Sequence, residues 1–153
     1  MISKFRKLLE QTLTNESATA GPDKQQLINM AAAVLFVEVM QADHNVDKRE
    51  REVVKLALME SFSLSRHDAN ELLSQAEARV KGVTSLHEFT SMLHARLTNE
   101  EKVSLIEQIW RIILADEEVD KYEEHLVRRI AELLYVSHSD YIRAKLSAQG
   151  DLG

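Results

Sequence analysis

The sequence predicts an all-α fold, a compact bundle of about seven or eight helices built from two pseudo-repeated helix–acidic loop–helix units. Three observations support this fold. Apolar residues recur at helical spacing, and the alternation typical of strands is absent. Residues that commonly begin helices recur along the chain. A nine-residue acidic motif occurs twice, each time after an apolar segment.

Residues able to cap a helix N-terminus divide the chain into helices. Asp23 is predicted to cap a long, largely buried helix that runs to about Gln41. The later starts combine a side-chain oxygen with an acid at the spacing of a capping box. These pairs are Asp47 with Glu50, Ser65 with Asp68, Ser85 with Glu88, Thr98 with Glu101, Asp120 with Glu123, and Ser137 with Asp140. The helix that starts at Asp47 is expected to end near Met59.

The chain is predicted to hold one helical domain, residues 23–147, preceded by a separate N-terminal segment. The clearest break is Gly21-Pro22, after a small and polar stretch. Residues 1–22 are therefore assigned to an N-terminal amphipathic helix and a linker, and residues 148–153 to a flexible tail.

The N-terminal segment is basic and apolar, but it lacks the long apolar core of a signal peptide. Ile2, Phe5, Leu8 and Leu9 share one side of a short helix. Docking of this helix on the domain is the favoured interpretation, and docking on a membrane or a partner protein is the alternative.

Composition excludes several classes of function. The net charge is −6, whereas nucleic acid and anionic membranes require a positive surface. The absence of cysteine excludes disulfides, zinc–thiolate sites, iron–sulfur clusters and thiol catalysis, and it suits a cytoplasmic location. No stretch approaches the ~20 apolar residues of a membrane-spanning helix.

The acidic motif is the strongest functional signal in the sequence. Residues 42–50, ADHNVDKRE, recur as residues 115–123, ADEEVDKYE, with six of nine positions identical. Farther along the chain, residues 62–68 resemble residues 134–140. The repeated unit is thus a buried helix, an acidic loop, an amphipathic helix and a further capped helix. Two such units commonly pack around a pseudo-two-fold axis.

The repeated acids have a structural and a functional interpretation, and the sequence leaves both open. The candidate ligands are Asp43, Asp47, Glu50, Asp116, Asp120 and Glu123. Asp47 and Asp120 suit helix caps. Asp43 and Asp116 follow apolar helices, whose C-terminal dipole disfavours an anion. Either amides of the loop or a bound calcium or magnesium ion could offset this cost.

The sequence gives little support for other classes of binding or catalytic site. In an EF-hand, Lys48 would have to be glycine and Val54 the bidentate glutamate, and the second copy departs in the same way. The six histidines form no HExxH pair, so a zinc site is not predicted. There is also no glycine-rich phosphate loop and no nucleophile elbow.

The twice-repeated Ala-Asp-x-x-Val-Asp-Lys-x-Glu motif resembles the tellurite-resistance TerB-like family over roughly residues 27–142. The resemblance implies a bacterial helical bundle associated with tellurite and stress resistance. It also implies a divalent-cation role for the six acids named above. Many members have glycine where this chain has His44 and Glu117. A similar domain precedes the J domain of some co-chaperones, but this chain lacks His-Pro-Asp.

The leading hypothesis is a non-enzymatic domain that acts through contacts with a protein partner. A divalent cation at the acidic loops would condition these contacts, and a homodimer is left open. The alternatives are a metal-dependent enzyme that uses the same carboxylates and a purely structural module.

Overall fold

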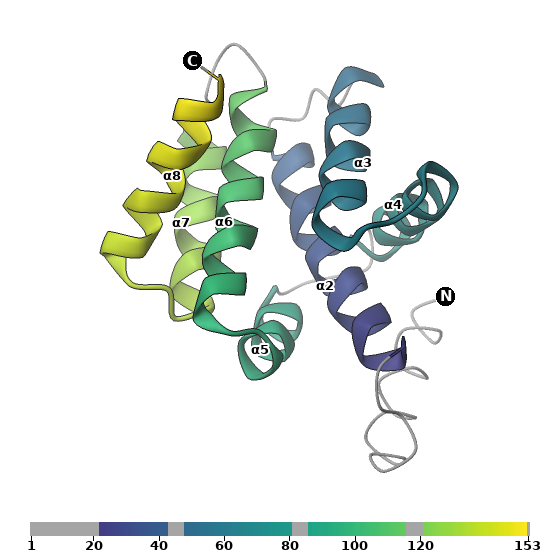
Figure 1. The fold of residues 1–153 in the computed structure, drawn as a ribbon, viewed down its shortest axis with the longest axis horizontal. Helices are drawn as coiled ribbons and strands as arrows, with labels where there is room; N and C mark the ends of the chain where they lie inside the picture. The colour runs from purple at the N-terminus through teal and green to yellow at the C-terminus, as the bar shows by residue number, and fades with distance from the viewer. Residues whose placement is uncertain (1–21, 43–47, 81–85, 116–120, 153) are drawn as a thin grey trace.

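The computed structural model describes residues 22–42, 48–80, 86–115 and 121–152 of the chain (Figure 1). This part holds seven helices and no strand, which confirms the predicted all-α fold. The helices are α2 (Pro22–Gln41), α3 (Lys48–Phe62), α4 (Arg66–Val80), α5 (His87–Arg96), α6 (Asn99–Leu114), α7 (Lys121–Leu133) and α8 (His138–Leu152). The predicted N-terminal helix lies outside the described residues.

Helix α2 is the centre of the bundle, as its dense apolar sequence predicts. It packs against α3, α4, α5, α6 and α7. Val34, Leu35 and Phe36 point in different directions around a helix, yet all three side chains are fully buried. A helix that is apolar on all sides is stable only when other elements surround it.

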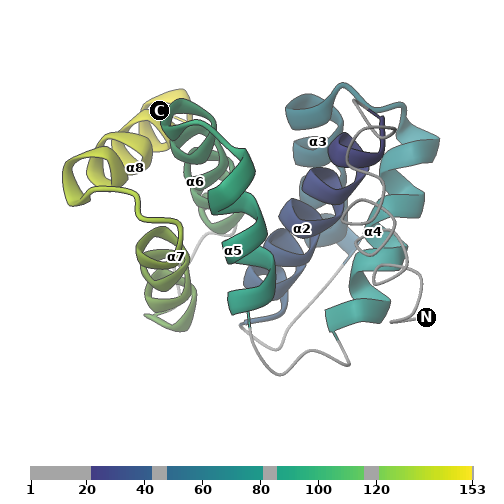
Figure 2. The same ribbon diagram turned by 90° about the horizontal axis from the view of Figure 1, so that it is seen from below.

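The helices form two groups that meet along α2 and α6. In Figure 2, α2, α3 and α4 lie on one side, α6, α7 and α8 on the other, and α5 between them. Helix α4 packs on α2, and α8 packs on α6. These pairs correspond in the two predicted repeats, but the pseudo-two-fold axis itself stays a prediction.

The α3–α4 and α7–α8 turns have the same backbone geometry. Ser63 has φ 53° and Tyr135 has φ 59°, both in the left-handed region. The next amide donates to a carbonyl of the preceding helix in each case, Leu64 N to Met59 O at 3.2 Å and Val136 N to Ala131 O at 2.9 Å. Both turns are therefore helix terminations of the Schellman type.

Three of the predicted helix caps are confirmed. Thr98 and Glu101 form a complete capping box at the start of α6. The hydroxyl oxygens of Ser65 and Ser137 each accept a hydrogen bond from the backbone N–H three residues on, at 3.1 and 3.2 Å. These bonds satisfy amides that lack a partner within the helix.

Three helix boundaries differ from the predicted ones by one to three residues. The N-cap of α5 is Leu86 rather than Ser85, and no side chain of the described residues caps this helix. Helix α2 begins at Pro22, so Asp23 lies inside its first turn. Proline suits that position because its missing N–H needs no partner there. Helix α3 continues past Met59 to Phe62, where the left-handed Ser63 ends it.

Candidate functional site

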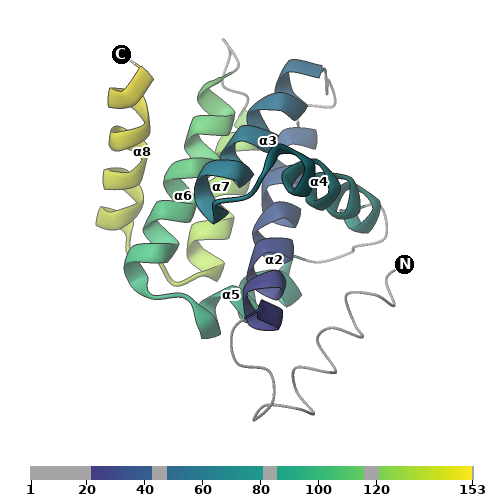
Figure 3. The same cartoon turned by 45° about the vertical axis from the view of Figure 1, so that its right-hand side comes forward.

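Both acidic segments connect to the same end of the bundle. Helices α2 and α6 run in the same direction and end side by side, and α3 and α7 begin at that end (Figures 1 and 3). Segments 43–47 and 116–120, which join these helices, lie outside the described residues. This end of the bundle is called the acidic end below.

The structure describes two of the six predicted ligands. Asp43, Asp47, Asp116 and Asp120 lie outside the described residues. Glu50, in the first turn of α3, is half-buried. Glu123, in the first turn of α7, is only 4% exposed. Each of these two carboxylates has a polar or electrostatic partner.

The positions of Glu50 and Glu123 in their helices can be explained without a metal ion. An acid in the first turn of a helix interacts favourably with the helix dipole. Within the described ranges, no three His, Asp or Glu side chains gather closely enough to hold a metal ion. A complete cation site therefore requires aspartates of the two acidic segments.

Glu38 is a further acid near the acidic end, and the sequence interpretation missed it. It lies in the last turns of α2, within the apolar run VLFVEVM. Partial burial raises the pKa of its carboxyl above the ordinary value of 4.5. The C-terminal dipole of α2 also disfavours a negative charge there. A lone acid inside an otherwise apolar helical run was the signal that could have identified it.

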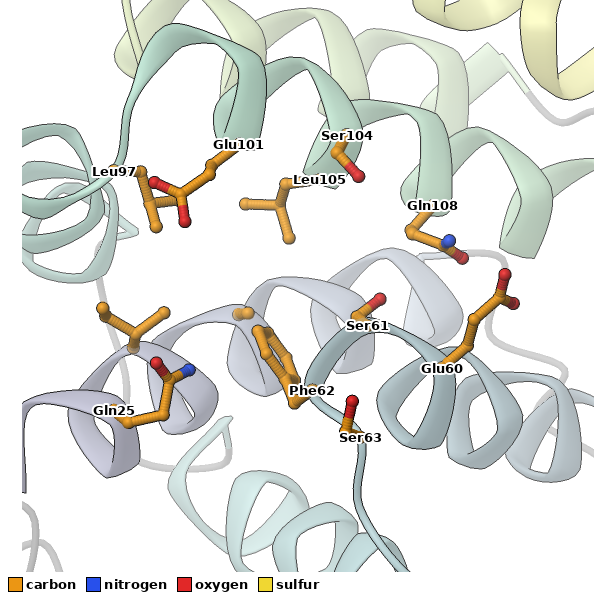
Figure 4. A pocket seen from close by; sticks show the side chains of 12 residues that line it. Gln25, Glu60, Ser61, Phe62, Ser63, Leu97, Glu101, Ser104, Leu105 and Gln108 are labelled. Carbon is orange, nitrogen blue, oxygen red and sulfur yellow. The ribbon is translucent and has the colours of Figure 1, made fainter. Parts of the chain in front are cut away.

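An open cavity lies away from the acidic end, between the first half of α6, the start of α2 and the end of α3 (Figure 4). It is an open groove of about 500 Å³. Its lining residues are Gln25, Ile28, Ala32, Glu60, Ser61, Phe62, Ser63, Leu97, Glu101, Ser104, Leu105 and Gln108. We call it the α2–α6 groove.

The α2–α6 groove combines an apolar wall with acidic groups. Glu60 keeps 65% of its side chain exposed, although Arg111 lies 3.5 Å from it. Glu101 accepts a hydrogen bond from the backbone N–H of Thr98 at 2.9 Å. Gln108 is only 8% exposed, and its amide faces Glu60 across the groove (Figure 4). No lysine or arginine is among the described residues that line the groove.

Comparison with known proteins establishes the family of the chain. The model of the family described as tellurite resistance protein TerB matches residues 29–146. The chain belongs to the TerB family. The match begins inside α2, ends inside α8 and includes both acidic segments.

A solved structure has a similar fold. The chain is similar to a protein of unknown function, PG1108 from Porphyromonas gingivalis W83, with a TM-score of 0.60 and 17% identity. The similarity covers 86% of this chain and 99% of that one. No curated protein matches the chain.

Along the described part of this TerB-family chain, no helix has the length and apolar character needed to cross a bilayer.

Burial of Glu38 predicts a pH-dependent effect of Glu38→Gln. The raised pKa means that the folded state disfavours the ionised carboxylate relative to the unfolded state. The resulting penalty is absent below the unfolded-state pKa, grows as the pH rises through the two values, and is complete above the folded-state pKa. Glu38→Gln is therefore expected to raise the free energy of unfolding at neutral pH and to have little effect near pH ~4.

Urea melts with EDTA at the two pH values measure this effect. Glu132→Gln is the matched control, because Glu132 also lies near the C-terminal end of a helix but is exposed. Equal effects of the two substitutions at neutral pH would show that burial of Glu38 does not matter.

Proposed function

We propose that this TerB-family chain is a non-enzymatic bacterial cytoplasmic domain that acts through contacts with a partner protein in a tellurite or stress response. A divalent cation, calcium or magnesium, binds at the acidic end and conditions those contacts. The observation that carries the proposal is the attachment of both acidic segments to one end of the bundle. In this proposal, a single cation would bind acids from two distant parts of the sequence.

The chemistry of the available donors supports a hard cation. Calcium and magnesium bind oxygen ligands, above all carboxylates. The chain has no cysteine, and the acidic motifs supply carboxylates in both copies. Asp43, Asp47, Asp116 and Asp120 would hold the ion, with Glu50 and Glu123 at the starts of the following helices. A bound cation would also offset the unfavourable charges at the C-terminal ends of α2 and α6.

Cation binding predicts a change in stability on addition of calcium or magnesium. An ion that binds only the folded state raises the free energy of unfolding by about 2.7 kcal/mol at a hundred times its Kd. Thermal melts in millimolar calcium, magnesium or EDTA measure this effect. The double variant Asp43→Asn with Asp116→Asn is expected to lose the ion response.

The matched control is Glu71→Gln with Glu132→Gln, which removes the same charge from two exposed positions in α4 and α7. This control should keep the ion response. If the acidic segments are only turns, ions will have no specific effect on the parent protein. The asparagine variant will then be as stable as the parent or more so, because an unfavourable charge is gone. That result would contradict cation binding and favour a purely structural role for the domain.

The protein-contact part of the proposal is tested separately. Affinity capture from the source cell with the parent chain, in calcium or magnesium and again in EDTA, should retain a partner only with the cation. The same capture with the asparagine double variant should retain no partner in either buffer. A partner retained equally by both proteins in both buffers would contradict a role for the cation.

A further inference from the structure

The α2–α6 groove has the features of a docking site for an amphipathic helix. Ile28, Phe62 and Leu97 provide apolar contact surface, and Glu60 and Glu101 provide negative charge beside it. The amide of Gln108 faces the groove and can donate or accept a hydrogen bond. Grooves of this kind bind the apolar face of a helix through side chains at positions i, i+3 and i+7.

The N-terminal segment of the same chain has the complementary chemistry. Ile2, Phe5 and Leu9 have the i, i+3 and i+7 spacing of such a face. The first nine residues contain Lys4, Arg6 and Lys7 and no acid. Positive charge on the segment therefore matches negative charge at the groove, in a chain whose net charge is −6.

The length of the connection permits this contact. Residues 14–21 would join a docked segment 1–13 to α2, and a chain of that length spans at most about 28 Å. Helix α2 is 20 residues long, or about 30 Å. Its first turns, with Gln25 and Ile28, form one wall of the groove. These connecting residues therefore start beside the groove and are long enough to place the N-terminal segment along it.

We propose that residues 1–13 dock in the α2–α6 groove of their own chain as an amphipathic helix. Ile2, Phe5 and Leu9 pack against the apolar wall, and the three basic side chains lie near Glu60 and Glu101. The covalent connection favours this occupant over a second copy or a foreign helix, because a short linker holds its segment at about millimolar effective concentration. Docking is independent of the cation at the acidic end.

Disulfide trapping tests the proposal, because the chain has no cysteine of its own. Thr12 continues the i, i+3 and i+7 spacing of Ile2, Phe5 and Leu9 in the sequence, and Ser104 is an exposed residue of the groove wall. In the full-length chain, Thr12→Cys with Ser104→Cys should form an intramolecular disulfide under mild oxidation. The initial rate should be about tenfold above that of the control pair, because docking adds to the concentration set by the tether.

The control pair is Thr12→Cys with Glu132→Cys, since Glu132 is exposed on α7, a helix that does not line the groove. Equal rates for the two pairs would overturn the proposal. Disulfide-linked dimers formed faster than the intramolecular bond would also overturn it, because a second copy would then occupy the groove. Far-UV circular dichroism checks that each variant is folded. If the Ser104 variant is not, Ser61→Cys on α3 takes its place.

Charge reversal separates docking from chance proximity. Lys4→Glu, Arg6→Glu and Lys7→Glu together, in the trapping variant, should lower the trapping rate to that of the control pair. Adding Glu60→Lys should restore part of the rate, because the opposite charges are exchanged. A rate unaffected by the triple reversal would contradict electrostatic recognition by the groove.

Discussion

Replacing Trp110 with alanine is expected to lower the free energy of unfolding by about 3–5 kcal/mol. Trp110 lies in α6 and is 1% exposed. Its ring packs edge-on against Tyr141 of α8, with ring centroids 6.1 Å apart, and the Lys145 ammonium lies 4.9 Å from its centroid. The substitution removes these contacts and leaves a large cavity between α6 and α8.

Chemical denaturation followed by far-UV circular dichroism measures this loss. Leu146→Ala is the matched control, because Leu146 also lies on α8 but is 59% exposed. The control should change stability by less than about 0.5 kcal/mol. A loss below about 1 kcal/mol for Trp110→Ala would mean that the neighbouring side chains refill the space, or that α6 is not central to the core.

Introducing proline at Ala33 is expected to unfold the domain. Ala33 lies in the middle of α2 and is fully buried. Proline in a helix interior removes one hydrogen bond and clashes with the preceding turn, which costs about 3 kcal/mol or more. A kink in α2 would also disturb its packing against α3, α4, α5, α6 and α7. These combined losses are comparable to the about 5–15 kcal/mol by which domains are stable.

The control for this prediction is Gln149→Pro, at an exposed position near the end of α8. It should cost far less, because few helical residues follow it. Far-UV circular dichroism at 25 °C should show lost helicity for Ala33→Pro and near-parent helicity for the control. A folded Ala33→Pro protein with a melting temperature close to the parent's would contradict the central role of α2.

Helices whose stability rests on local contacts were predicted well from the sequence. Thr98 and Glu101 are three residues apart, so their capping box forms wherever the backbone begins a helix. Ser65 and Ser137 cap α4 and α8 for the same reason. The buried state of α2 also followed from its sequence, because a helix without a polar face must be surrounded.

The capping-box spacing was a less accurate guide to the start of α5, where apolar side chains pack into the core. Ser85 and Glu88 have capping-box spacing, yet Leu86 occupies the N-cap of α5. Leu86 packs against the core, and Phe89 is buried. Burial of these apolar side chains is a constraint on the start of α5 that acts beside a cap contributing about 1 kcal/mol. Spacing alone contains no information about that packing.

The sequence by itself determined the helical fold, the central place of α2 and the two acidic motifs, because each depends on periodicity or on residues close along the chain. Only the tertiary structure decided that the helix ends flanking the two acidic segments lie at one end of the bundle. It also decided that α2, α3 and α6 enclose a groove. Glu60 and Glu101 are far apart in sequence, and side-chain packing between helices brings them to one cavity. The tertiary structure also decided the partial burial of Glu38, because neighbouring helices rather than its own sequence limit its access to water.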